Sequence, residues 1–214
     1  MFLFMILLFP TVLGFCAAHS DKKIYGFMIA LGAVSGIAVC ACSAVFSYMH
    51  RIPQYSLVIN FFYYFLKIYA LPLLLLYAAY FFVTKDSFEF RVKAFFPVVA
   101  SFYAIYMPYC IIAASDASFS FFLLFVKPVV MLSMVFLSSL IAYRIYCRAL
   151  ENSVSRIVLL GFCEFFVLAL PALLEALWLM CLMLPVVYIA AVIYALVALI
   201  LFFISSRGRS DFLF

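Results

Sequence analysis

The sequence has 214 residues, of which 72% are hydrophobic and 10% are charged, and its formal net charge is +5. Its mean hydropathy is +1.35, whereas soluble globular domains are about half apolar and about a quarter charged. A chain with so few polar residues cannot cover a water-facing surface with them. We therefore expect an all-α bundle of helices in a membrane. The positive charge does not indicate nucleic-acid binding. In a membrane protein, the distribution of basic residues among the loops instead indicates which side of the membrane each loop occupies.

Apolar runs bounded by short charged or turn-forming stretches predict seven transmembrane helices. A helix needs about 20 residues to cross an apolar core of about 30 Å. The run 157–205 is therefore too long for one helix, and Pro185 favours a turn within it. The predicted segments are 1–17, 24–48, 57–83, 94–114, 120–142, 157–178 and 184–205, which gives a bundle over residues 1–206 and a short cytoplasmic tail over 207–214.

The first segment has two interpretations, a transmembrane helix and a cleaved signal peptide. The stretch "FCAAHS" resembles a small-residue cleavage site, but the start "MFLFMILLF" has no basic region. A conventional signal also leaves the new N-terminus outside, which would send the following basic loops outside as well. We therefore expect residues 1–17 to be retained as a helix.

The basic residues between these segments predict the orientation of the chain. Ten of them fall on one side of the membrane, and Arg51 is alone on the other side. Because loops rich in lysine and arginine stay in the cytoplasm, we expect the N-terminus outside and the C-terminus inside the plasma (inner) membrane. The ten residues are Lys22, Lys23, Lys85, Arg91, Lys93, Arg144, Arg148, Arg156, Arg207 and Arg209.

Four ionisable residues fall inside predicted helices: Lys67, Lys127, Glu164 and Glu175. Each costs about 3 kcal/mol at the centre of a membrane helix unless it faces the interior, pairs or reaches the interface. The two glutamates are eleven residues apart, about three turns, so they share one face of their helix. Glu175 and Lys127 match best in depth, and Lys67 lies midway between the glutamates.

Two interpretations of these charges stay open. They pair or reach the interface for structural reasons, or they line a polar cavity with a function. Tyr64, Tyr103 and Tyr106 are candidate lining residues, since hydroxyls inside a bundle need partners, but tyrosines also serve in packing and in interfacial belts.

Prolines and small residues add two further expectations. Pro128 follows Lys127, and Pro171 lies between the two glutamates, so both are candidate helix hinges. Gly32 and Gly36 belong to a stripe of small residues that allows close helix approach. We expect this stripe to pack within the bundle, with packing between protomers as the alternative.

The layout resembles the seven-helix membrane sensor region of bacterial LuxR-type regulators and histidine kinases. The stretch "SVSRIVLLGFCEFFVLALPALLEAL" is similar to the entry of the sixth helix of such modules, in which a basic loop precedes an apolar helix with a proline and an acid. The sequence ends at "ISSRGRSDFLF" without the output domain of these proteins. The resemblance therefore implies a stand-alone sensor subunit or a truncated sensor.

We expect an integral membrane sensor or ligand-binding module. Its partners would be membrane lipids, a small or lipid-like ligand, and a cytoplasmic or membrane protein, but no nucleic acid. The alternatives are a small transporter or permease subunit that uses the intramembrane glutamates and lysines, and a structural subunit of a membrane complex. No nucleophile–base set or metal-binding motif is visible, so we expect no enzyme activity, no metal and no cofactor.

Overall fold

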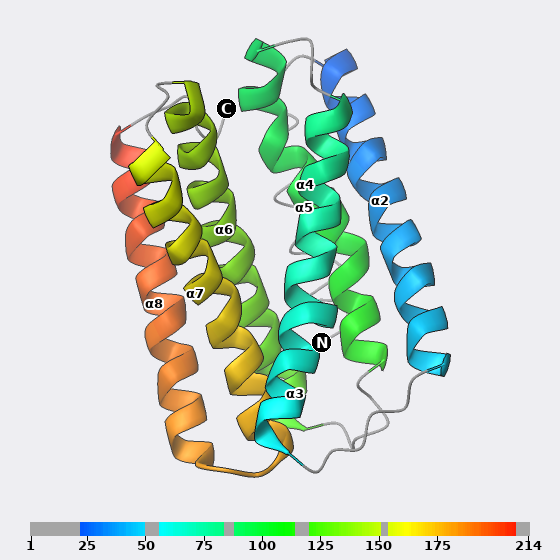
Figure 1. Cartoon of the computed structure of the whole chain (residues 1–214), viewed down its shortest axis with the longest axis vertical. Helices are drawn as coiled ribbons and strands as arrows, with labels where there is room; N and C mark the ends of the chain where they lie inside the picture. Colours follow the sequence, from blue (N-terminus) through cyan, green and yellow to red (C-terminus); the bar gives the residue numbers. More distant parts are fainter. Residues whose placement is uncertain (1–21, 50–55, 84–87, 114–119, 151–153, 209–214) are drawn as a thin grey trace. The chain divides into compact units, whose positions relative to one another are not determined.

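The structure is a computed structural model that describes residues 22–49, 56–83, 88–113, 120–150 and 154–208 (Figure 1). These residues form helices and no strand, so the predicted all-α fold is confirmed for this part of the chain. The helices are α2 (Lys22–Met49), α3 (Leu57–Tyr63), η1 (Tyr64–Ala70), α4 (Leu71–Val83), α5 (Phe88–Ala113), η2 (Phe122–Val126), α6 (Lys127–Leu150), α7 (Val154–Leu179) and α8 (Leu184–Gly208).

Six of the seven predicted segments fall in these helices, and the segment 1–17 lies outside the described residues. By length and composition, five of the described helices are apolar enough to cross a membrane. They are Gly26–Val45, Leu57–Val83, Phe122–Ala142, Val154–Leu179 and Leu184–Leu201. The chain therefore has the composition of a multi-pass membrane protein. The helix α5, which contains residues 94–113 of the predicted segment 94–114, is not among the five, and its first two turns carry Glu89, Arg91 and Lys93.

Contacts along the chain divide it into two compact units. The described part of the first unit consists of α2, α4, α5, most of η2 and the last residues of α8, and that of the second unit consists of α3, η1, the end of η2, α6, α7 and most of α8. The helix α8 runs to Gly208, so it includes the first two residues of the predicted tail, and residues 209–214 lie outside the described part.

In the first unit, α2 packs on α5 through Gly32 and Gly36. A Cβ atom added to Gly32 would overlap with Ser101 Oγ and with the carbonyl oxygen of Val98. A Cβ atom added to Gly36 would lie 3.0 Å from the carbonyl oxygen of Phe102. The small-residue stripe therefore lets the two helix backbones approach closely within one chain.

In the second unit, α7 packs against α6 and η1, and a tight turn connects α7 to α8. The amide of Leu182 donates to the carbonyl of Leu177 at 2.9 Å, and the amide of Cys181 donates to the carbonyl of Trp178 at 2.9 Å. These two hydrogen bonds form a Schellman motif, in which the residue after the helix adopts the left-handed backbone conformation. Cys181 takes that position with φ of 54°.

The predicted turn between the last two helices is therefore present, but Pro185 does not form it. Pro185 lies in the first turn of α8, where its missing amide hydrogen has no helical acceptor to lose. The direction of the chain changes at Cys181 and Met183, which both have positive φ values.

Two π-helical segments precede prolines. η1 ends two residues before Pro72, and η2 ends two residues before Pro128. Proline clashes with the carbonyl four residues earlier and cannot donate to it, and a wider turn accommodates both effects. A π-helical segment also rotates the following residues about the helix axis relative to a regular α-helix. It therefore changes which side chains point into the second unit.

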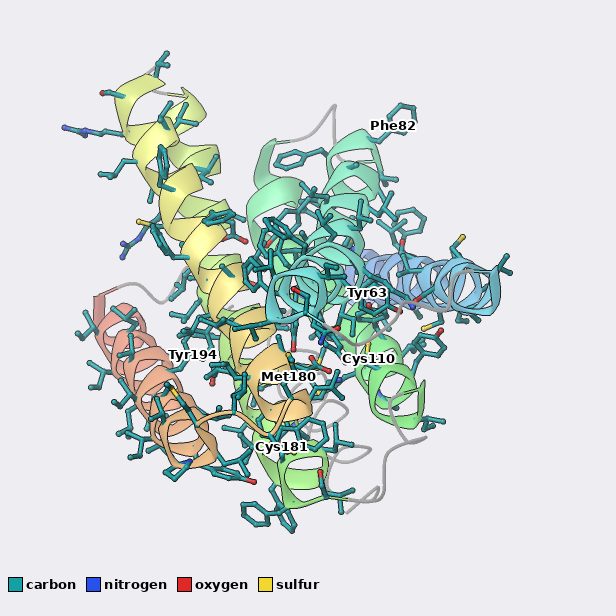
Figure 2. All side chains as sticks on the ribbon, turned by 60° about the horizontal axis from the view of Figure 1, so that its bottom comes forward. Tyr63, Phe82, Cys110, Met180, Cys181 and Tyr194 are labelled. Carbon is teal, nitrogen blue, oxygen red and sulfur yellow. The ribbon has the colours of Figure 1, made fainter. Side chains whose placement is uncertain are left out.

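Large apolar side chains are exposed on the candidate spans, as expected for surfaces that contact lipid. Phe82, near the end of α4, is 86% exposed and projects away from its helix (Figure 2). Along α8, exposed and buried residues lie on different sides of the helix. Val186, Ile189 and Val192 are exposed, whereas Val187 and Tyr194 are buried.

Candidate intramembrane polar site

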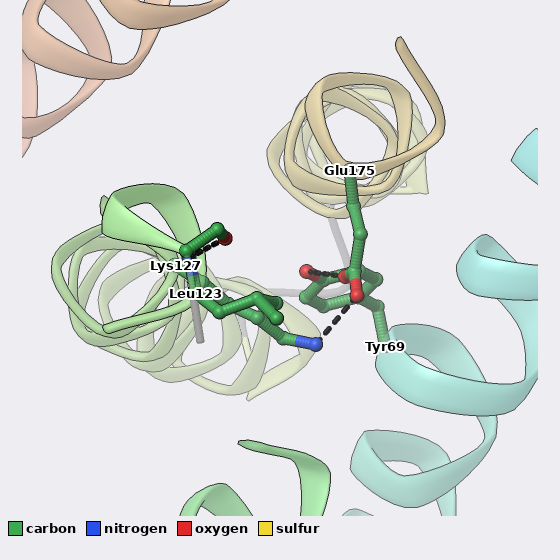
Figure 3. A network of polar contacts seen from close by, with 5 residues as sticks. Tyr69, Leu123, Lys127 and Glu175 are labelled. Atoms are coloured by element: carbon green, nitrogen blue, oxygen red, sulfur yellow. Dashed lines mark hydrogen bonds and ion pairs between the residues drawn. The ribbon is translucent and has the colours of Figure 1, made fainter. Parts of the chain in front are cut away.

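Three helical segments of the second unit bring together Tyr69, Lys127 and Glu175 (Figure 3). Lys127 Nζ lies 2.5 Å from Glu175 Oε1 and forms an ion pair with it. The Tyr69 hydroxyl donates a hydrogen bond to Glu175 Oε2 at 2.7 Å. Each carboxylate oxygen therefore has its own donor. We call these three residues the Glu175 cluster.

The local sequence explains why these side chains point inward. Tyr69 lies at the end of η1, and Lys127 is the first residue after η2. Glu175 lies four residues after Pro171 in α7. All three residues thus stand within four positions of a helix proline, and Tyr69 and Lys127 also lie in or next to a π-helical segment.

The Glu175 cluster is almost fully buried. The exposed fractions of Tyr69, Lys127 and Glu175 are 1%, 1% and 2%. A single charge at such a site is costly, but an ion pair with a further hydrogen bond offsets much of the desolvation. The cluster is therefore stable as a unit, and removing either charge leaves the other one uncompensated.

A second carboxyl, the half-buried Glu164, lies on the same helix but has a different environment. Glu164 Oε1 accepts a hydrogen bond from the hydroxyl of Ser138 on α6. Glu164 Oε2 is buried and has no hydrogen-bond partner. Within the described part of the chain, Glu164 has no ion-pair partner, whereas Glu175 has Lys127. The two glutamates that share one face of α7 thus differ in how their charge is compensated.

The remaining predicted site residues of the second unit are Lys67 and Tyr64. Lys67 Nζ donates to the hydroxyl of Tyr63, one turn earlier, and lies 4.7 Å from the centre of that ring. Tyr64 packs edge-on against Tyr63 and interacts electrostatically with Glu175. Both residues thus contact Tyr63.

Tyr103 and Tyr106 belong to the first unit, where both are fully buried in α5. Their rings pack against Phe102, with centroid distances of 5.1 and 5.5 Å. Their described ring contacts are thus those of core packing.

The candidate hinges Pro128 and Pro171 both lie next to the polar residues. Pro128 is the second residue of α6, after the π-segment η2. Pro171 lies inside α7, which continues through it. The carbonyl that Pro171 leaves without a donor is that of Val167, and the hydroxyl of Tyr194 on α8 donates to it at 2.9 Å. In Figure 2, Tyr194 lies on the side of α8 that faces α7.

Sequence reasoning missed Tyr69. The sequence marks it only as a tyrosine three residues before Pro72, and the side chain points at Glu175 because η1 is π-helical. For the described residues, no group of three or more His, Cys, Asp or Glu side chains is placed to hold a metal ion.

Comparisons with protein-family models, with curated proteins and with solved structures give no match to this chain. The function therefore has to be argued from the Glu175 cluster and from Glu164.

Proposed function

We propose that this chain is a membrane sensor or ligand-binding module in which an anionic amphiphile binds at Lys127. The proposal includes seven transmembrane helices in the plasma membrane, with the N-terminus outside and the C-terminus in the cytoplasm. The observation that supports it is the buried ion pair between Lys127 and Glu175. Charged residues in membrane helices are costly and therefore often mark a ligand or ion pathway.

The chemistry of the cluster favours a ligand with a carboxylate or phosphate head. Such a head accepts hydrogen bonds from Lys127 Nζ in the same way as Glu175 Oε1 does. Glu175 would keep its hydrogen bond from Tyr69 when Lys127 turns to the ligand. A molecule that reaches a site inside a candidate span must also dissolve in the bilayer, which indicates an apolar tail.

Exchange of partners at Lys127 would loosen α6 from α7. The two helices meet at the ion pair, and a proline lies within four residues of each charge. A bend at Pro128 or Pro171 would transmit the change to α8 and from there to a cytoplasmic or membrane partner.

Trp178 provides a reporter for this proposal. It is the one tryptophan of the sequence and lies three residues after Glu175 on α7. Protein in lipid nanodiscs is titrated with a fatty acid brominated in its tail, which quenches tryptophan fluorescence at short range. We expect saturable quenching that weakens at least tenfold in Lys127→Met, which corresponds to about 1.4 kcal/mol, and that persists in Lys127→Arg.

The methyl ester of the same brominated acid is the control, because it enters the bilayer without an anionic head. Equal quenching by the acid and the ester in the wild-type protein would contradict an anion site. The ion pair would then be structural, as in a subunit of a larger complex.

A second candidate, a small transporter or permease subunit, is favoured by one observation. Glu164 is a half-buried carboxyl that forms no ion pair among the described residues, as expected for a site that binds and releases cations. Proton flux into proteoliposomes that Glu164→Gln abolishes would support this candidate. Absence of flux in the wild-type protein would count against it.

The orientation has its own test. A green fluorescent protein fused after Phe214 folds in the cytoplasm, whereas an alkaline phosphatase at the same position is active only outside. We expect fluorescence and no phosphatase activity, because ten basic residues lie on the proposed cytoplasmic side. Phosphatase activity would reverse the orientation.

A further inference from the structure

The carboxyl of Glu164 occupies a site that compensates its charge poorly. Its Oε1 accepts a hydrogen bond from Ser138, its Oε2 is buried without a partner, and no basic side chain of the described residues forms an ion pair with it. Glu175 on the same helix accepts hydrogen bonds at both oxygens, one of them from a lysine. The two carboxyls are eleven residues apart in sequence.

The groups around Glu164 come from three elements packed near it. Ser138 faces it from α6. Tyr194 on α8 interacts with it electrostatically, but its hydroxyl proton is donated to the carbonyl of Val167. On η1 the cation is Lys67, whose described contacts are with Tyr63. Among the described residues, none of these groups forms an ion pair with the Glu164 carboxylate.

In such surroundings the free energy of an ionised carboxylate lies far above that of a neutral carboxylic acid. A single hydrogen bond from a neutral donor offsets little of the hydration that the charge loses. We infer that Glu164 is an intramembrane proton-binding site, whereas Glu175, eleven residues along the same face, is paired with Lys127. The ligand of this site is the proton itself.

This arrangement has a consequence for the charge of the second unit. Loss of the proton places an uncompensated negative charge between α6 and α7, beside Ser138. The deprotonated state must therefore gain another cation or move the helices until Glu164 reaches water. Proton binding at Glu164 and helix packing are coupled, and this coupling is independent of the ligand proposed for Lys127.

Infrared spectroscopy of the whole protein in lipid bilayers tests the inference. A protonated carboxyl gives a carbonyl stretching band that shifts in D₂O, and a carboxylate gives symmetric and antisymmetric bands instead. We expect the spectrum of the wild-type protein at neutral pH to contain a carbonyl band that disappears in Glu164→Gln. The matched variant Glu175→Gln keeps this band and loses carboxylate intensity.

A second measurement covers the case in which a variant fails to insert. Dicyclohexylcarbodiimide, an apolar reagent, adds to protonated carboxyls within membranes, and mass spectrometry of the wild-type protein locates the adduct. We expect the adduct on Glu164 and not on Glu175, with labelling that declines as the pH rises. A spectrum without a Glu164-dependent carbonyl band at neutral pH would overturn the inference, as would preferential labelling of Glu175.

Discussion

The hydroxyl of Tyr194 on α8 donates a hydrogen bond to the carbonyl oxygen of Val167 on α7 at 2.9 Å. This carbonyl is the one that Pro171 leaves without its helical donor, four residues later in the chain. Membrane helices tolerate proline because neighbouring helices satisfy the freed group. Tyr194 therefore supplies a donor to the part of α7 that lies between Glu164 and Glu175.

The effect of Tyr194→Phe should depend on the proline. In the wild-type background we expect the free energy of unfolding to fall by about 1 kcal/mol, since the variant leaves the partly buried carbonyl of Val167 without its donor. In Pro171→Ala the helix regains its own donor, so the same substitution should cost less than half as much. Denaturation with sodium dodecyl sulfate in mixed micelles measures both values. Equal losses of unfolding free energy in the two backgrounds would show that the contribution of the Tyr194 hydroxyl does not depend on Pro171.

Replacement of cysteine by glycine should have opposite effects at two positions. Cys181 has φ of 54° after the end of α7, where a residue with a Cβ atom costs about 1 kcal/mol relative to glycine. Cys163 is exposed inside α7, where glycine costs about 1 kcal/mol. We therefore expect Cys181→Gly to stabilise the protein and Cys163→Gly to destabilise it, as read from the same denaturation curves. Destabilisation by both would be inconsistent with the Schellman turn.

The packing of α2 on α5 predicts a large difference between two glycines of α2. Gly32→Ala forces the helices apart, since the new methyl group overlaps with Ser101 and the backbone of Val98. Its expected cost is about 2 kcal/mol. Gly26→Ala is the control, because nothing lies within 4 Å of its added Cβ atom. Thermal stability in detergent compares the two variants, and equal melting temperatures would argue against this helix contact.

The same substitution at the two glutamates of α7 separates their roles. Glu175→Leu leaves Lys127 buried without its counter-charge, so we expect a loss of about 3 kcal/mol. Glu164→Leu removes a carboxyl without a cationic partner in the described structure, so we expect a change within about 1 kcal/mol. Unfolding in mixed micelles provides the comparison. A larger loss for Glu164→Leu would reverse the assignment of the two carboxyls.

Much of the helical architecture follows from the sequence, because long apolar runs and the charged stretches between them are one-dimensional signals. The pairing of Lys127 with Glu175 is also accessible in this way. The depth of a residue in a membrane can be counted from the end of its helix at about 1.5 Å per residue. Of the intramembrane lysines and glutamates, Lys127 and Glu175 match best in depth.

The rotation of a helix about its axis cannot be counted so simply. Lys67 and Tyr69 are two residues apart and point in different directions in a regular α-helix. η1 is π-helical, and it directs Tyr69 toward Glu175 while Lys67 contacts Tyr63. The proline at 72 is a signal of irregular backbone, but it does not specify a π-segment or its phase.

The division into two units was also not predictable from composition. Tyr103 and Tyr106 have the same residue type as Tyr64 and similar apolar neighbours in the sequence, yet they pack in the first unit. Residue type and depth do not determine which helices become neighbours. The contacts at Gly32 and Gly36 are specific to α5, and this pairing needs the structure.

The central claim is that Lys127 and Glu175 form one buried ion pair, and a double-mutant cycle measures it most directly. The variants are Lys127→Met, Glu175→Gln and the combination of both, with the free energy of unfolding determined in mixed micelles. We expect each single substitution to cost about 3 kcal/mol, and the combination to cost at least about 2 kcal/mol less than the sum. Additive costs would show that the two charges do not interact, which would contradict the account.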